Sequence, residues 1–133
     1  MAKLRHIAIS VPDPEKSAQF YEEAFGLKRV GETDSPLATG VYLSDGVINV
    51  ALLRYKTDEA AGAERGKSYV GVHHFGFQVD DLEEAQRRVE EHGGTFFLDL
   101  PDMKDTLYYE RKFRDPDGII FDISHHGWVG TSR

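Results

Sequence analysis

Cysteine is missing from this chain of 133 residues, so neither a disulfide bond nor a thiolate metal site can form. The absence of cysteine is typical of a protein from a reducing cytoplasm, which is the location we expect. A long apolar run is missing as well, because no stretch reaches the length of about 18 residues that a membrane-spanning helix needs. We therefore expect no signal peptide, no transmembrane helix and no membrane partner.

Basic residues are also in short supply. The chain has 16 lysines and arginines against 23 aspartates and glutamates, which gives a formal net charge of −7. A nucleic-acid backbone repels such a surface, so we expect no nucleic-acid partner. Glycine-rich phosphate loops and serine nucleophile elbows are not found either. The 40% share of hydrophobic residues is that of an ordinary globular protein, and a chain of this length buries enough surface for a single domain.

The most informative feature that is present is an internal repeat. The segment RHIAISVPD at 5–13 is matched 68 residues later by HHFGFQVDD at 73–81, and each copy is followed by an amphipathic helix and strand-like segments. We predict an α+β fold in which two βαβββ modules form a curved mixed sheet around a half-barrel cavity. The expected parts of the single domain, 1–133, are module one at about 3–56, a linker at about 57–69, module two at about 70–126 and a loose tail at 127–133.

Capping signals locate the two helices. Asp13 is a good N-cap, Pro14 is tolerated in the first turn, and Gly26 is suited to end the helix in a left-handed conformation. Asp81 repeats the N-cap in the second copy, and Gly93 follows the second helix. The strands expected after the two helices are 28–32, 40–43, 47–54, 95–100, 106–114 and 119–124.

Strand alternation separates the side chains of each repeat into two faces. Ile7 and Ile9 share the face that a helix must cover, which leaves His6 on the other face. Phe75 and its neighbours leave His74 on the equivalent face of module two. His73 has the opposite parity and is expected at the edge of the sheet.

The last predicted strand adds a carboxylate to the two histidines. Asp122 alternates with Phe121 and Ile123, so it faces away from the helix like His6 and His74. A single strand histidine is more often a packed residue than a ligand, but its recurrence at the equivalent place favours a site. Two imidazoles and one carboxylate are suitable ligands for one divalent Fe, Mn, Ni or Zn ion.

Three segments of the chain resemble the vicinal oxygen chelate superfamily. They are LRHIAISVPD at 4–13, VHHFGFQVDDLEEA at 72–85 and FRDPDGIIFDIS at 113–124, and the resemblance extends over about 3–126. The superfamily includes glyoxalase I, extradiol ring-cleaving dioxygenases, methylmalonyl-CoA epimerase, and fosfomycin and bleomycin resistance proteins. It implies that His6 and His74 match the first-strand ligands and that Asp122 stands where the family usually has glutamate.

The resemblance also implies a fourth ligand position on 47–54, where this chain has no acid. The turn before the strand aligns Val50 with Asp122, whereas the alternation of polarity favours Asn49 and Ala51 as the inward residues. A missing acid differs from the four-ligand set of glyoxalase I and is closer to the His-His-carboxylate set of the extradiol dioxygenases.

These resemblances lead to the functional expectations. We expect a metal-dependent enzyme that chelates a small substrate through neighbouring oxygens, with a dioxygenase-like site favoured over a glyoxalase-like lyase or isomerase. His126, Tyr108 and Tyr109 are the candidate catalytic residues. A metal-free binding or resistance protein is the alternative from another class. The resemblance also implies a homodimer.

Overall fold

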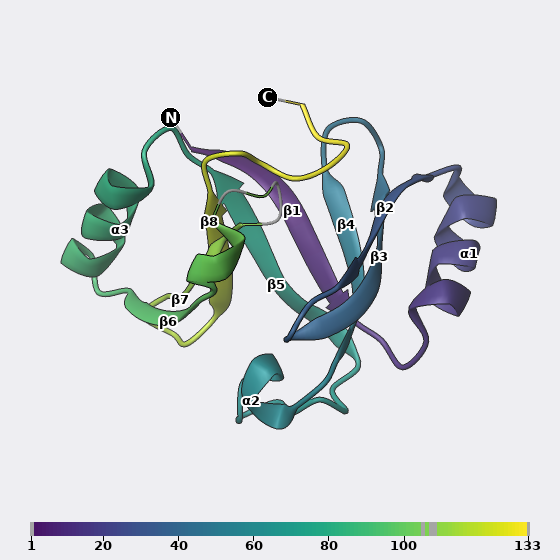
Figure 1. Cartoon of the computed structure of the whole chain (residues 1–133), viewed down its shortest axis with the longest axis horizontal. Helices are drawn as coiled ribbons and strands as arrows, with labels where there is room; N and C mark the ends of the chain where they lie inside the picture. The colour runs from purple at the N-terminus through teal and green to yellow at the C-terminus, as the bar shows by residue number, and fades with distance from the viewer. Residues whose placement is uncertain (1, 105, 107–108, 133) are drawn as a thin grey trace.

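The repeat is visible in the order of the secondary-structure elements (Figure 1). The computed structural model describes residues 2–104, 106 and 109–132. The elements of the first half are β1 (Lys3–Ser10), α1 (Pro14–Phe25), β2 (Lys28–Asp34), β3 (Ala38–Ser44), β4 (Asn49–Tyr55) and α2 (Asp58–Ala61). Those of the second half are β5 (Gly71–Gln78), α3 (Leu82–Glu91), β6 (Thr95–Asp99), a 3-10 turn (Pro101–Met103), β7 (Arg111–Arg114) and β8 (Ile120–Ser124).

The strands form one open, mixed sheet of eight strands in the order β2-β3-β4-β1-β5-β8-β7-β6. Within each module the first strand pairs in parallel with the last, β1 with β4 and β5 with β8. The first strands of the two modules, β1 and β5, pair antiparallel at the centre. The predicted α+β class with two βαβββ modules in a curved mixed sheet is thereby confirmed.

The helices begin where the capping residues indicated. The Asp13 side chain accepts the amide of Lys16, and Gly26 ends α1 with a φ of 72°. The Asp81 side chain accepts the amides of Glu83 and Glu84 at the start of α3. Figure 1 shows both helices on the outer flanks of the curved sheet.

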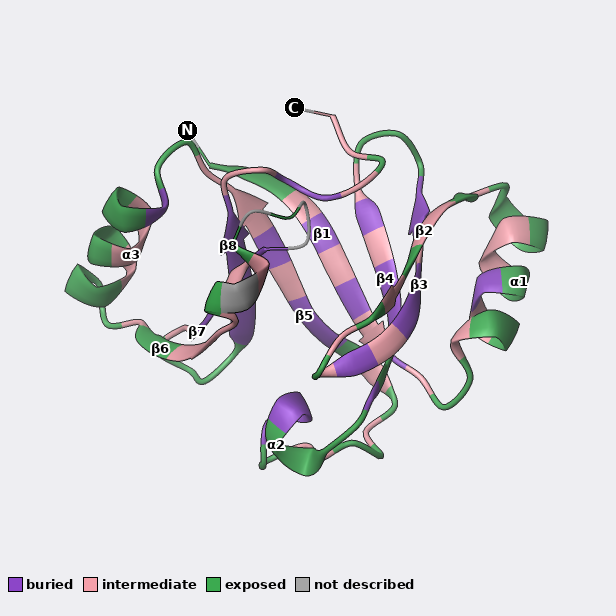
Figure 2. Ribbon diagram, in the orientation of Figure 1, coloured by how far each residue is buried: buried purple, intermediate pink, exposed green. Residues whose placement is uncertain are grey.

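Each long helix covers the apolar face that alternation assigned to it. Under α1, Leu52 and Leu43 are buried against Ala18, with Ile9 packed beside them. The equivalent cluster under α3 contains Phe75, Phe77, Val89, Phe113, Phe121 and Ile123. The histidine face is therefore left for the concave side, and Figure 2 shows that the buried positions concentrate on the central strands.

Three segments depart from the sequence-based expectations. The segment expected to be a linker contains the short helix α2, whose Ala60 and Ala61 are buried against the concave side of module one. The segment expected to be a loose tail contains Trp128, which is buried. The predicted strand 106–114 is shorter, because β7 begins only at Arg111. No helix among the described residues is long and apolar enough to cross a membrane.

The caps provide a test of the helix assignment. Asp81→Ala removes the acceptor for two amides at the start of α3 and is expected to lower the free energy of unfolding by about 1 kcal/mol. Asp81→Asn keeps an acceptor and should stay within a few tenths of the wild-type value. Urea denaturation followed by circular dichroism measures both, and equal losses in the two variants would contradict the capping role.

Candidate metal centre

Three neighbouring central strands bring His6, His74 and Asp122 together. The His74 Nε2 atom lies 3.0 Å and the His6 Nε2 atom 3.7 Å from Asp122 Oδ2. The candidate ligand atoms of all three residues lie within 4.8 Å of one another. His6 and His74 are each 2% exposed and Asp122 is 0% exposed, so the cluster is sealed from bulk solvent.

The pairing of β1 with β5 explains how two histidines fit side by side. His6 is opposite Gly76, and His74 is opposite Ala8. His6 therefore lies across from the small residue two positions after His74, and His74 lies across from the small residue two positions after His6. The centroids of the two imidazole rings are 5.4 Å apart. The alternation of histidine with a small residue in the repeat is the sequence cause of this arrangement.

The hydrogen bonds of His6 fix which nitrogen faces the cluster. His6 Nδ1 lies 2.8 Å from Asn49 Oδ1, while the amide nitrogen of Asn49 donates to the carbonyl of Val129. The amide oxygen can only accept, so His6 Nδ1 carries the proton. The Nε2 atom is then the ring nitrogen of His6 that faces Asp122.

The same reasoning applies to His74. His73 Nε2 donates to the carbonyl of Ala61 at 2.6 Å, and the pKa of His73 is lowered, mainly by burial, so its Nδ1 is an acceptor. His74 Nδ1 donates to that atom at 2.8 Å, with the Tyr55 hydroxyl nearby. The Nε2 lone pair of His74 therefore also points at Asp122.

This arrangement leaves a buried place for a cation. Asp122 Oδ2 and His74 Nε2 have no hydrogen-bond partner among the described residues, although both are buried. Burial, followed by the charges of Lys112 and His6, holds the pKa of His74 well below its usual range, so no proton separates the two lone pairs. A divalent metal ion bound to the three atoms would relieve this repulsion, and the donor set is suitable for one.

The other oxygen of Asp122 is held by a buried ion pair. Lys112 Nζ lies 3.0 Å from Asp122 Oδ1 and 3.3 Å from Glu110 Oε1. Burial alone would lower the pKa of Lys112, but the two carboxylates outweigh it and raise the pKa. Because Lys112 engages Oδ1, Asp122 has Oδ2 left for the histidine side.

A family model and several relatives match this chain. The model is that of the glyoxalase/bleomycin resistance protein/dioxygenase superfamily, and it matches residues 3–123. The chain belongs to this superfamily.

Relatives agree with the assignment. A probable trivalent organoarsenical cleaving enzyme from Bacillus subtilis is 36% identical over 126 residues, which cover 87% of this chain and 75% of that protein. A lactoylglutathione lyase from Neisseria meningitidis is 30% identical over 130 residues, covering 91% and 88%. Among solved structures, Streptomyces coelicolor methylmalonyl-CoA epimerase is similar in fold, with a TM-score of 0.75, 17% identity, and coverage of 91% and 94%.

Strand register resolves the question of a fourth ligand position. Gly76 pairs with Asp122 in module two, and Ala8 pairs with Ala51 in module one. Since Ala8 and Gly76 are equivalent in the repeat, Ala51 is the counterpart of Asp122, and its methyl group cannot ligate a metal. Asn49 lies beside His6 instead and orients that ring. The described site therefore has three candidate ligands, and position 51 adds none.

The expected catalytic residues have other contacts. The Tyr109 hydroxyl donates to Asp99 and accepts from Arg111, and its ring packs in the α3 cluster. The ring of His126 packs 3.8 Å from that of His125. Neither contact brings the residue to the cluster of His6, His74 and Asp122, and Tyr108 lies outside the described residues.

Sequence reasoning did not identify His73 as a partner of the cluster. It was expected at the sheet edge, but it is buried beside His74. The register of β5 against β1 shifts between Ala8 and Ile9, so His73 is the extra residue of a bulge and its side chain is re-aimed. Arg5, which is equivalent to His73 in the repeat, lies at the corresponding register shift near the start of β1. The linker then folds back so that Ala61 can accept from His73.

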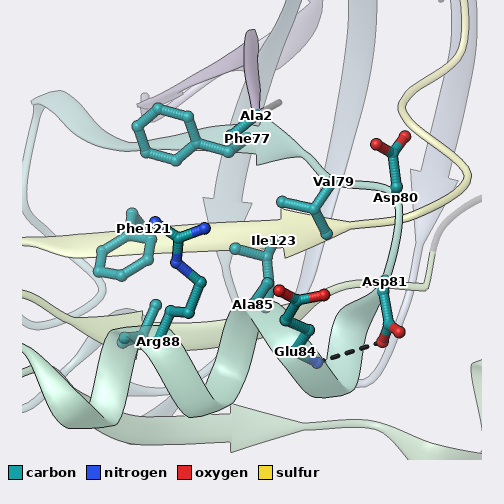
Figure 3. A pocket seen from close by; sticks show the side chains of 11 residues that line it. Ala2, Phe77, Val79, Asp80, Asp81, Glu84, Ala85, Arg88, Phe121 and Ile123 are labelled. Atoms are coloured by element: carbon teal, nitrogen blue, oxygen red, sulfur yellow. Dashed lines mark hydrogen bonds between the residues drawn. The ribbon is translucent and has the colours of Figure 1, made fainter.

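A larger cavity lies elsewhere, on the helix side of β5 and β8 (Figure 3). It has a volume of about 560 Å3 and an apolar floor that includes Phe77, Phe121 and Ile123, with Arg88 pointing across it. These apolar residues alternate with His74 and Asp122 along the same strands, so the cavity lies on the opposite face of the sheet from the cluster. A hollow of about 40 Å3 on the concave side is lined by Tyr42 and Glu110, among others.

The buried ion pair can be tested by its effect on stability. Lys112→Met leaves two buried carboxylates without their cation and is expected to cost about 3–5 kcal/mol of unfolding free energy. Lys56→Met removes an exposed partner of Asp34 and should change stability by less than about 1 kcal/mol. Chemical denaturation compares the two, and similar small losses would show that the Lys112 pair is not structural.

Proposed function

We propose that this protein is a metal-dependent enzyme that binds one divalent ion through His6, His74 and Asp122 and chelates a small substrate through neighbouring oxygens. The observation that carries the proposal is the convergence of two imidazole nitrogens on a buried carboxylate oxygen that has no hydrogen-bond partner among the described residues. A packed structural cluster would place a proton between such atoms, because buried polar groups are almost always paired.

The ligand set favours iron and oxygen chemistry. Two histidines and one carboxylate with open positions are typical of non-haem Fe(II) oxygenases. When bound, the ion would be held by His6, His74 and Asp122 and would act as a Lewis acid toward the substrate oxygens. The three-ligand set, with Ala51 in the fourth position, supports a dioxygenase-like reaction before a glyoxalase-like lyase or isomerase. Manganese, nickel or zinc would be suitable for the glyoxalase-like lyase or isomerase reaction.

The chain's own residues prepare the site for that chemistry. Asn49 and His73 each set the tautomer of one ligand histidine, so that both Nε2 atoms are ready to bind without loss of a proton. Lys112 holds one oxygen of Asp122 and leaves the other for the ion. Burial excludes water and strengthens every charge interaction in the site.

The amino-acid composition of this chain limits which substrates can be inferred from its relatives. The Bacillus subtilis relative is a probable organoarsenical cleaving enzyme, and trivalent arsenic prefers soft thiolate ligands. This chain has no cysteine and offers no such ligand. We therefore propose a substrate that binds through oxygen atoms.

Assembly and location follow as further parts of the proposal. We propose a homodimer, a cytoplasmic location and a single domain divided near 57–69, with neither nucleic acid nor membrane as a partner. Each chain carries the complete ligand set, since His6, His74 and Asp122 meet within one chain.

Metal binding is the first test. Apoprotein titrated anaerobically with Fe(II), and separately with Mn(II), Ni(II) and Zn(II), should bind one ion per chain by isothermal titration calorimetry. His6→Ala, His74→Ala and Asp122→Ala should each abolish stoichiometric binding, because each removes one of three ligands. His92→Ala, at the exposed end of α3, is the matched control and should bind like the wild type.

Oxygen uptake with catechols, run beside lyase assays with thiol adducts of aldehydes, then separates the reactions. A protein that binds no ion while its histidines stay hydrogen-bonded in place would contradict the enzyme proposal and favour a metal-free binding protein.

Ala51 allows the three-ligand assignment to be tested by adding a ligand. Ala51→Glu supplies a carboxylate at the counterpart of Asp122 and should tighten Zn(II) or Ni(II) binding by about tenfold or more while lowering turnover, because an open position is filled. Ala51→Gln, of similar size, controls for overpacking of this buried position. Equal metal affinities in the two variants would show that position 51 does not face the ion.

A further inference from the structure

The last described residues cross over the site. We name Gly127–Ser132 the C-terminal strap; Figure 1 shows it running from the end of β8 across the top of the central strands toward the hairpin of β3 and β4. Its sequence gives no strand or helix pattern, and none is observed within it. The strap nevertheless contains Trp128, the single tryptophan of the chain, which is only 8% exposed.

Side chains of module one hold the strap in place. Ser44 Oγ donates to the carbonyl of Gly130 at 2.7 Å, and Arg5 Nε donates to that of Ser132 at 2.9 Å. Asn49 donates to the carbonyl of Val129 at 3.0 Å. Because Asn49 also accepts from His6, the strap is connected directly to the residue that orients this ligand.

Trp128 itself contacts the metal-ligating cluster. Its ring stacks on His6, with centroids 4.7 Å apart and planes within 2°. Space for it exists because Gly76 has no side chain: a Cβ there would lie 2.8 Å from the indole ring. The Nε1 atom donates to Glu110 Oε2 at 2.9 Å, and Glu110 in turn contacts Lys112. One side chain therefore touches a ligand ring and the ion-pair network of Asp122.

We propose that Trp128 is a positioning residue of the metal centre: by stacking on His6 and bonding Glu110, it fixes the plane of the His6 imidazole and closes that side of the site. This proposal rests on the proposed function, because it concerns the same ion. Partners that orient a ligand ring commonly contribute about 10–100-fold to metal affinity.

Metal affinity gives the first test. Trp128→Ala should raise the Kd for Ni(II) or Zn(II) by about 10–100-fold while one ion per chain still binds, since all three ligands remain. Trp128→Phe keeps an aromatic face for His6 but loses the Nε1 donor, and it should bind closer to wild type than to the alanine variant. Phe25→Ala, which removes a 72% exposed aromatic ring on α1, is the control and should leave Kd unchanged.

The fluorescence of the single tryptophan reports whether the ion binds beside Trp128. One equivalent of Ni(II) should quench Trp128 emission in the wild type and in the Phe25→Ala variant, and His6→Ala should remove this response. Acrylamide should quench the apoprotein weakly, because Trp128 is buried.

A second variant keeps the proposal open to refutation if Trp128→Ala fails to fold. Ser44→Ala releases one anchor of the strap without touching a ligand, and it should increase both acrylamide quenching and the Kd for the ion.

The outcomes separate this proposal from the one it rests on. Wild-type protein that binds one ion, with unchanged Kd in Trp128→Ala and Ser44→Ala, overturns the role of Trp128 and leaves the metal site standing. Wild-type protein that binds no ion overturns both. Weaker binding in Trp128→Ala with recovery in Trp128→Phe supports the proposal.

Discussion

The unpaired contact between His74 Nε2 and Asp122 Oδ2 is the constraint on which the rest of this structure depends. Two acceptors 3.0 Å apart in a sealed interior are unfavourable, and a buried polar atom without a partner costs about 1–3 kcal/mol. The surrounding fold maintains this contact: His73 directs the proton of His74 away from Asp122, and Lys112 keeps hold of the other carboxylate oxygen. Groups held against their own preference in this way are typical of functional sites.

The two modules have diverged around a shared frame. The antiparallel pairing of β1 with β5 makes His6 and His74 symmetric, but their surroundings differ. Module two supplies the acid Asp122 where module one has Ala51, and Gly76 leaves room for an indole where module one has Ala8. The symmetric histidines thus lie in an asymmetric site.

Much of the architecture could be predicted because it follows from local rules. Alternation placed the large apolar residues under the helices and both histidines on the other face, and Asp13 and Asp81 marked the helix starts. The position of Asp122 followed from the same parity. The fourth position was ambiguous in sequence, because Asn49, Val50 and Ala51 could be separated only by the pairing of β1 with β4.

Other parts of the site depend on contacts that the alternation of side chains along a strand cannot predict. His73 was misplaced because a bulge overrides parity, and the start of β7 was set too early because the strand begins only at Arg111. Trp128 was overlooked because the residues that its ring contacts, such as His6 and Gly76, lie more than 50 residues earlier in the chain. Lys112 could have been predicted from the sequence, because the turn at 115–118 sets a hairpin register that places Lys112 opposite Asp122.

The central claim is most directly tested by crystals of the protein grown with Mn(II) or Zn(II), with diffraction data collected on either side of the absorption edge of the metal. The account predicts one anomalous peak per chain, about 2.0–2.2 Å from His6 Nε2, His74 Nε2 and Asp122 Oδ2. A peak bound by other residues, or an empty site in which a proton or a water molecule joins His74 to Asp122, would contradict it.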